Sequence, residues 1–155
     1  MKKTKLSLCA PFSPEGERGL YLWREVFLAH FDVLAYPKEL CPKEGVDVEV
    51  QEGYVKVYLH KATFTFWRAR YLHVEDAPLS LCQRSLEKEG EGIIYDTKEG
   101  HLAFIEGEFW LAEVKAKDDE KAFATFVAQF LHHYLSGLSL AEVLEKAGEA
   151  SRNVV

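Results

Sequence analysis

The strongest constraint on the fold is a helical pattern near the carboxyl end of the chain, over residues 118–135. Apolar side chains recur there at intervals of three and four, which is typical of an α-helix with one buried face. These residues are Phe123, Phe126, Val127, Phe130, Leu131, Tyr134 and Leu135. Glu120, Lys121 and Gln129 fall on the other side. Because a helix of this kind must bury its apolar face, the rest of the chain has to supply a second layer.

The preceding part of the chain has the patterns of strands. Residues 46–50 alternate between valine and acidic residues, and residues 54–59 alternate between aliphatic and polar or aromatic residues, with Gly53 at the turn. Each pattern predicts a strand with one buried and one wet face. We expect further strands over residues 4–10, 62–74 and 93–96. Residues 101–116 are expected to form one long strand or two, with a kink or turn at Gly107. Residues 79–87 fit a strand or a helix, and the neighbouring strands favour a strand.

Two more helices are expected, one on each side of the strand region. Ser13 and Pro14 suit the first positions of a helix. An apolar stripe at helical spacing extends this helix to Tyr36 and Pro37. The stripe consists of Leu20, Trp23, Phe27, Phe31 and Leu34. Residues 139–142 form a capping box, which predicts a short helix to about Gly148 and a frayed tail from Ala150.

These elements predict an α+β fold. Short links between successive strands do not allow parallel crossovers, so we expect an antiparallel meander. The expected architecture is a curved sheet of about six to seven strands packed on the long C-terminal amphipathic helix, with one helix after strand one. A length of 155 residues suits a single domain over 1–155.

Composition narrows the range of partners and conditions. The formal net charge is −6 and the basic residues do not cluster, which argues against nucleic acid as a partner. No apolar run approaches the ~20 residues of a membrane span. Asn occurs once and Gln three times against 19 Glu, and this depletion of thermolabile residues is typical of proteins from thermophiles.

The three cysteines are Cys9, Cys41 and Cys82. Their spacings contain no CxxC pair, so the usual zinc and redox motifs are missing. An odd number of cysteines indicates reduced thiols, and we expect a cytoplasmic protein. Cys9 and Cys82 are expected to be buried and inert.

No motif assigns a catalytic residue, a metal or a cofactor. The six histidines include no HxxxH or HExxH spacing, and adjacent His132 and His133 point about 100° apart on a helix. His101 or His73 beside Glu106 or Glu108 would suit acid–base chemistry. Nothing in the spacing brings these side chains together, and the sequence favours exposed strand residues. We therefore expect no metal and no cofactor.

The order of elements resembles the helix-grip superfamily, which includes START lipid-transfer domains, polyketide cyclase-like proteins and plant pathogenesis-related proteins. The matching features are Ser13-Pro14-Glu15 after strand one, the strands from Val46 to Ala116, and the helix from Asp118 to Leu135. The resemblance covers nearly the whole chain as element order. It implies a cavity between the sheet and the long helix that binds a small hydrophobic molecule.

The residues that would line such a cavity follow from the resemblance. The candidate ligand-binding residues are Trp67, Arg70, Phe104, Trp110, Phe126 and Phe130. Arg70 would orient a carboxylate or carbonyl group. Two alternatives stay open at this point. The same aromatics fill the core of an interaction protein that forms a homodimer through a sheet edge or through Tyr21, Leu22 and Val26, or the cavity holds a cyclase or lyase site with Arg70 and a histidine.

Overall fold

The computed structural model describes residues 3–10, 22–37, 40–42, 46–51, 53–59, 62–68, 91–97, 100–105, 108–113 and 120–154. This part of the chain contains eight strands, two long helices and a helical segment over residues 22–28. The strands are β1 (Thr4–Ala10), β2 (Phe31–Pro37), β3 (Val46–Gln51), β4 (Tyr54–Tyr58), β5 (Thr63–Arg68), β6 (Glu91–Asp96), β7 (Gly100–Ile105) and β8 (Glu108–Glu113). The helices are α3 (Glu120–Leu135) and α4 (Leu140–Arg152).

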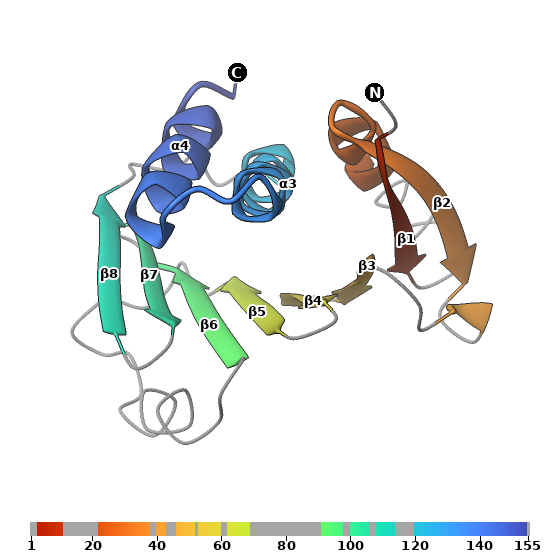
Figure 1. Ribbon diagram of the computed structural model, residues 1–155, viewed down its shortest axis with the longest axis horizontal. Helices are drawn as coiled ribbons and strands as arrows, with labels where there is room; N and C mark the ends of the chain where they lie inside the picture. The colour runs from red at the N-terminus through yellow and green to blue at the C-terminus, as the bar shows by residue number, and fades with distance from the viewer. Residues whose placement is uncertain are drawn as a thin grey trace.

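The strands form one curved sheet in the order β2-β1-β3-β4-β5-β6-β7-β8. The helical segment 22–28, α3 and α4 all lie on the concave face of this sheet (Figure 1). The α+β class, the curved sheet and the long C-terminal helix are as predicted from the sequence. The sheet has more strands than expected.

The expected antiparallel meander is wrong, because the sheet is mixed. β1 pairs in parallel with both β2 and β3, and β5 pairs in parallel with β6. The remaining neighbours are antiparallel. Parallel neighbours need a long connection, and here residues 11–30 connect β1 to β2 while residues 69–90 connect β5 to β6. The expected strand over 79–87 lies outside the described residues.

The predicted first helix extends too far toward the carboxyl end. Among the described residues helix covers 22–28, and the chain then enters β2 at Phe31. The expected start at Ser13 and Pro14 lies outside the described residues. Phe31 and Val33 are buried while Asp32 and Leu34 are exposed, which is the period of a strand. Phe31 and Leu34 also fit a helical spacing, so the pattern alone did not separate the two structures.

The core lies between the concave face and the helices. Val48, Val55 and Val57 of the central strands are at most 1% exposed, and they belong to one apolar cluster with α3. Trp23 joins the helical segment 22–28 to α3: its Nε1 donates a hydrogen bond to Oε1 of Glu120 at 3.3 Å, and its ring meets Phe123 edge to face. This packing fixes α3 across the sheet.

The second C-terminal helix begins as the capping box predicts. The Ser139 side chain accepts a hydrogen bond from the backbone N–H of Glu142, and α4 then packs along α3. The expected fraying from Ala150 is wrong, because α4 continues to Arg152 and the buried Ser151 hydroxyl donates to the Ala122 carbonyl at 3.1 Å. Neither α3 nor α4 has the combination of length and apolar composition that crossing a bilayer requires, and the same is true of the described segment 22–28.

Candidate ligand-binding site

A groove of about 380 Å³ lies on the convex face of the sheet, opposite the helices. It crosses strands β3 to β6. Its lining side chains occupy alternate strand positions, which place them on the face away from the core. They are Glu49, Tyr54, Lys56, Tyr58, Thr65, Trp67, Glu91 and Ile93, with the backbone of Gly92. The groove therefore results from the same alternation that builds the core.

Two aromatic rings form one end of the groove. Tyr54 and Trp67 face each other across the β4–β5 ladder, with ring centroids 5.1 Å apart and planes at 38°. Trp67 is 36% exposed, whereas Trp23 is 2% exposed and Trp110 is half-buried. A tryptophan held against a second ring in an open groove offers a flat apolar surface with a polar edge, as ligand sites commonly do.

Charged and hydroxyl groups occupy the other end. Glu49 lies opposite Lys56 in the β3–β4 ladder, and Lys56 lies opposite Thr65 in the next one. The Lys56 ammonium sits 5.4 Å from the centroid of the Tyr58 ring. Partial burial raises the pKa of Tyr58, and the Glu49 carboxylate raises it further through its charge and a hydrogen bond. The Tyr58 hydroxyl thus stays protonated and remains a donor.

A second hollow of about 440 Å³ lies near the amino end, lined by Lys3, Lys5, Leu28, Phe31 and Asp32. It is larger, but its one aromatic ring, Phe31, is only 2% exposed. Its other walls are exposed side chains, including two long flexible lysines. The convex groove combines rings with fixed polar groups and is the better candidate.

Three of the residues predicted to bind a ligand lie between the sheet and the helices. Phe126 and Phe130 are fully buried on α3, and Trp110 packs against the same core. Phe66 meets both phenylalanines edge to face, with centroids 6.0 and 5.2 Å away. Side chains thus fill the described space between α3 and the sheet at this point.

The other predicted residues are placed elsewhere. Trp67 and Phe104 occupy convex-face positions of β5 and β7, so they point away from Phe126 and Phe130. Trp67 belongs to the groove, whereas Phe104 is 7% exposed and lies outside it. Arg70 lies outside the described residues. The five residues that are described therefore divide between the two faces, and their role in ligand binding stays a prediction.

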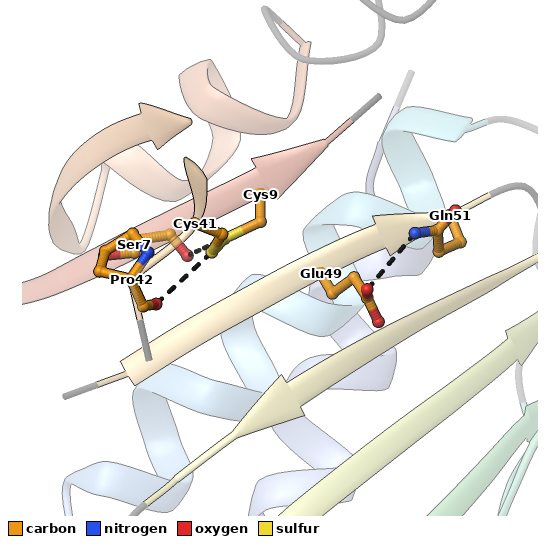
Figure 2. The surroundings of a disulfide bond; sticks show 6 residues. All are labelled: Ser7, Cys9, Cys41, Pro42, Glu49 and Gln51. Carbon is orange, nitrogen blue, oxygen red and sulfur yellow. Dashed lines mark hydrogen bonds between the residues drawn. A yellow bond between two sulfur atoms is a disulfide. The ribbon is translucent and has the colours of Figure 1, made fainter. Parts of the chain in front are cut away.

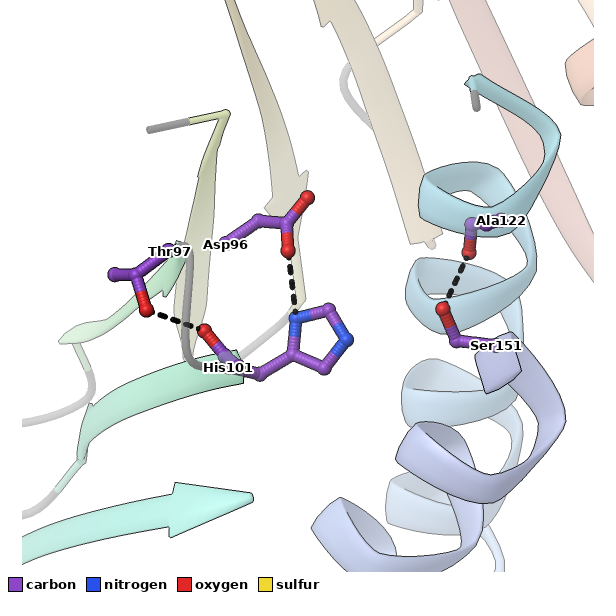
Figure 3. A network of polar contacts seen from close by, with 6 residues as sticks. Asp96, Thr97, His101, Ala122 and Ser151 are labelled. Carbon is purple, nitrogen blue, oxygen red and sulfur yellow. Dashed lines mark hydrogen bonds and ion pairs between the residues drawn. The ribbon is translucent and has the colours of Figure 1, made fainter. Parts of the chain in front are cut away.

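A buried polar pair lies beside α3. Nδ1 of His101 is 3.4 Å from Oδ1 of Asp96, and both side chains are 1% exposed (Figure 3). The His101 ring stacks on Phe126 with centroids 3.7 Å apart. The expectation that His101 is an exposed strand residue is wrong, because it occupies an inward position of β7 that the sequence alternation does not distinguish. A dyad this deeply buried orients a core side chain and is closed to a substrate.

Three histidines meet where the helical segment 22–28 ends. The rings of His30 and His132 stack at 4.1 Å, and His133 lies next to His132 with centroids 5.1 Å apart. Burial and the neighbouring histidines lower the pKa values of His30 and His133. In the described parts of the chain, no three histidine, cysteine or acidic residues are grouped so as to hold a metal ion.

Of the residues that line the groove, only Trp67 was predicted from the sequence, although the sequence contains a pattern that indicates others. Tyr54, Lys56 and Tyr58 alternate on the wet side of a predicted strand, where two neighbouring aromatics are unusual. Pairing these positions with Thr65 and Trp67 of the next strand requires the register, which the structure provides.

Comparison with known proteins does not assign this chain to a family. No protein-family model matches the chain, and no curated protein matches it. The geometry of the groove therefore carries the functional argument.

Proposed function

We propose that this protein is a binding protein whose ligand lies in the convex-face groove. The observation that carries the proposal is the half-exposed Trp67 ring, held against Tyr54 among the charged side chains of Glu49, Lys56 and Glu91. A large apolar ring kept open to solvent beside fixed donors and acceptors is the usual composition of a small-molecule site.

This proposal moves the ligand away from the space that the helix-grip resemblance implies. A small hydrophobic molecule between the sheet and α3 would have to displace Phe126 and Phe130, which already pack against Phe64 and Phe66. Such close packing favours a filled core at this point. A ligand could occupy the exposed groove without displacing any core side chain, so the groove is the better supported site.

A homodimer is the second proposal, and one observation favours it. Strand β2 forms an edge of the described sheet, and Leu34 on this strand is 57% exposed. Exposed apolar edges pair readily with another strand. Of the helix residues first considered, Leu22 and Val26 are half-buried, and Tyr21 lies outside the described residues. A cyclase or lyase reaction receives less support, because the His101 side chain is closed to solvent.

We also keep a cytoplasmic location as part of the proposal. The argument from reduced thiols no longer applies, because Cys9 and Cys41 form a disulfide. Intracellular proteins of hyperthermophiles nevertheless contain disulfides, and the Glu-rich, Asn-poor composition suits such a source.

The proposal is tested by following the indole N–H signal of Trp67 in a two-dimensional NMR spectrum of the full chain. The probes are cellotriose, maltotriose, chitotriose, adenosine, choline and benzoate. We expect at least one probe to shift the Trp67 signal while the buried Trp23 signal stays in place, because Trp67 lines the groove and Trp23 does not. Isothermal titration with the probe that shifts the signal should show binding lost in Trp67→Ala and kept in the control Leu34→Ala, which lies two strands away from the groove. If every probe left the Trp67 signal unmoved, the proposal would be wrong.

A further inference from the structure

We infer that the ligand of the groove is a carbohydrate, a short neutral oligosaccharide. This inference rests on the proposed function and goes further by naming the ligand class. It follows from three features of the groove: an exposed aromatic surface, a mixture of hydrogen-bond donors and acceptors, and a length that crosses four strands.

The aromatic surface suits a sugar ring. A pyranose presents one face made largely of C–H groups, and this face packs on the π-surface of tryptophan or tyrosine. Trp67 and Tyr54 lie side by side and tilted by 38°, so together they offer a shallow apolar surface rather than a slot. A purely hydrophobic ligand would remove water from the charged groups at the other end of the groove and offer them no hydrogen bond in return, which is costly.

The polar lining contains both kinds of hydrogen-bonding group. Glu49 and Glu91 supply carboxylate acceptors, Lys56 supplies an ammonium donor, and Thr65 and Tyr58 supply hydroxyls. Sugar hydroxyls both donate and accept, so a sugar can form hydrogen bonds with both kinds of group. Hydrogen bonds to charged groups are the stronger ones and would orient the ring.

Charged ligand classes fit less well. A phosphate group would approach two carboxylates on a chain of net charge −6. A quaternary ammonium group is drawn to aromatic faces, but in this groove it would be repelled by the like charge of the Lys56 ammonium, which lies over the Tyr58 ring. A neutral ligand is repelled neither by the two carboxylates nor by the Lys56 ammonium.

The extent of the groove indicates more than one sugar unit. Its lining spans β3, β4, β5 and β6, which is three strand-to-strand intervals. At about 4.8 Å per interval this is about 14 Å, enough for two or three pyranose units in a row. A single sugar would contact only part of this extent, so oligosaccharides should bind more tightly than monosaccharides.

The test is isothermal titration of the full chain with cellotriose, maltotriose and chitotriose, and with glucose, adenosine and choline for comparison. We expect one oligosaccharide to bind more tightly than glucose and more tightly than adenosine or choline. Trp67→Ala should weaken that binding on the order of tenfold or more, and Trp67→Phe, which keeps a ring, should weaken it less. Lys56→Met should weaken it as well, by removing the donor while keeping the length of the side chain.

The outcomes separate this inference from the proposed function. If adenosine, choline or benzoate shifts the Trp67 signal and no sugar does, the carbohydrate inference is overturned and the groove remains a ligand site. If a sugar binds equally well to wild type and to Trp67→Ala, the inference is overturned because the sugar lies elsewhere. If no probe shifts the Trp67 signal, both fail. A native-like spectrum of Trp67→Ala shows that a loss of binding in this variant is not a loss of fold.

Discussion

At the scale of single residues, Gly92 belongs to a strand that contributes to both the core and the groove, and the core packs closely against it. Gly92 lies on β6 opposite Phe64 of β5, on the face toward the helices. A methyl group added at its Cα would overlap the Phe64 ring and lie 3.1 Å from Cγ1 of Ile105. The Phe64 ring cannot turn away, because it packs edge to face on Phe130 and Tyr134 at 5.3 and 4.9 Å. Only glycine fits at this position.

We therefore expect Gly92→Ala to lower the free energy of unfolding by about 1–3 kcal/mol, as overpacking of a core does. The measurement is urea denaturation of wild type and variant. A double-mutant cycle with Phe64→Leu tests the cause: the smaller side chain gives the methyl group room, so Gly92→Ala should cost less in that background. An equal cost in both backgrounds would show that the Phe64 ring is not what excludes the methyl group.

At the scale of elements, the histidine cluster joins the N-terminal helical segment to α3. Nε2 of Gln129 lies 2.8 Å from Nε2 of His30. Since the amide nitrogen can only donate, His30 accepts, and this contact holds the neutral ring. His132, His133 and Lys3 add positive charge near His30, and Lys146 does so near His133. The junction therefore favours the neutral forms of His30 and His133.

The pH dependence of stability follows from these lowered pKa values. Burial comes first among the causes for both His30 and His133, and the charge of His132 comes second. Below the ordinary value of 6.5 the unfolded chain binds protons that the folded protein does not. The free energy of unfolding should therefore fall as pH drops through 6.5, and level off once the pH is below the folded pKa values.

His132→Phe tests this origin, because it keeps a ring against His30 and removes the charge. The loss of stability between about pH 7.5 and pH 5.5 should be smaller in this variant than in wild type. Urea denaturation at several pH values gives both curves. Parallel curves would mean that the decrease arises from other groups.

The elements themselves could be predicted where a single periodicity dominated. β1 has the predicted bounds, α3 ends at the predicted Leu135, and Ser139 caps α4. β2 could not be predicted, since Phe31 and Leu34 satisfy both a helical and an alternating pattern. The choice between them depends on β1, which pairs with β2 through all seven of its residues. Local patterns do not contain that information.

At the scale of the whole molecule, topology and site depend on contacts distant in sequence. The parallel pairs β1–β3 and β5–β6 could not be predicted, because strand patterns do not say which strands are neighbours. The candidate site could be predicted only in part for the same reason. Trp67 was singled out, but its partner Tyr54 becomes visible once β4 and β5 are placed in register.

The disulfide between Cys9 and Cys41 is a further long-range contact, and it overturns the expectation of reduced thiols. Cys9 is a buried residue of β1, and Cys41 follows β2 (Figure 2). Their Cα atoms are 5.6 Å apart, within the usual range for disulfides. The count of three cysteines suggested no pairing, yet an odd number leaves room for one bond and one thiol. The bond closes a loop that contains the helical segment 22–28 and all of β2.

This loop makes the disulfide a determinant of the stability of the entire chain. The two cysteines are 32 residues apart, and closing a loop of that length in the unfolded chain stabilises the folded state by about 3–4 kcal/mol. Reduction, or the double change Cys9→Ser and Cys41→Ser, should lower the free energy of unfolding by this amount in guanidinium chloride. Cys82→Ala is the matched control, because it removes the third thiol without adding a polar group, and it should largely keep the stability of the oxidised protein. Thiol titration of the unfolded, unreduced chain should give one thiol in wild type and none in Cys82→Ala. Three thiols in wild type would show that the bond does not form, and equal stability with and without reductant would show that closing this loop does not stabilise the fold.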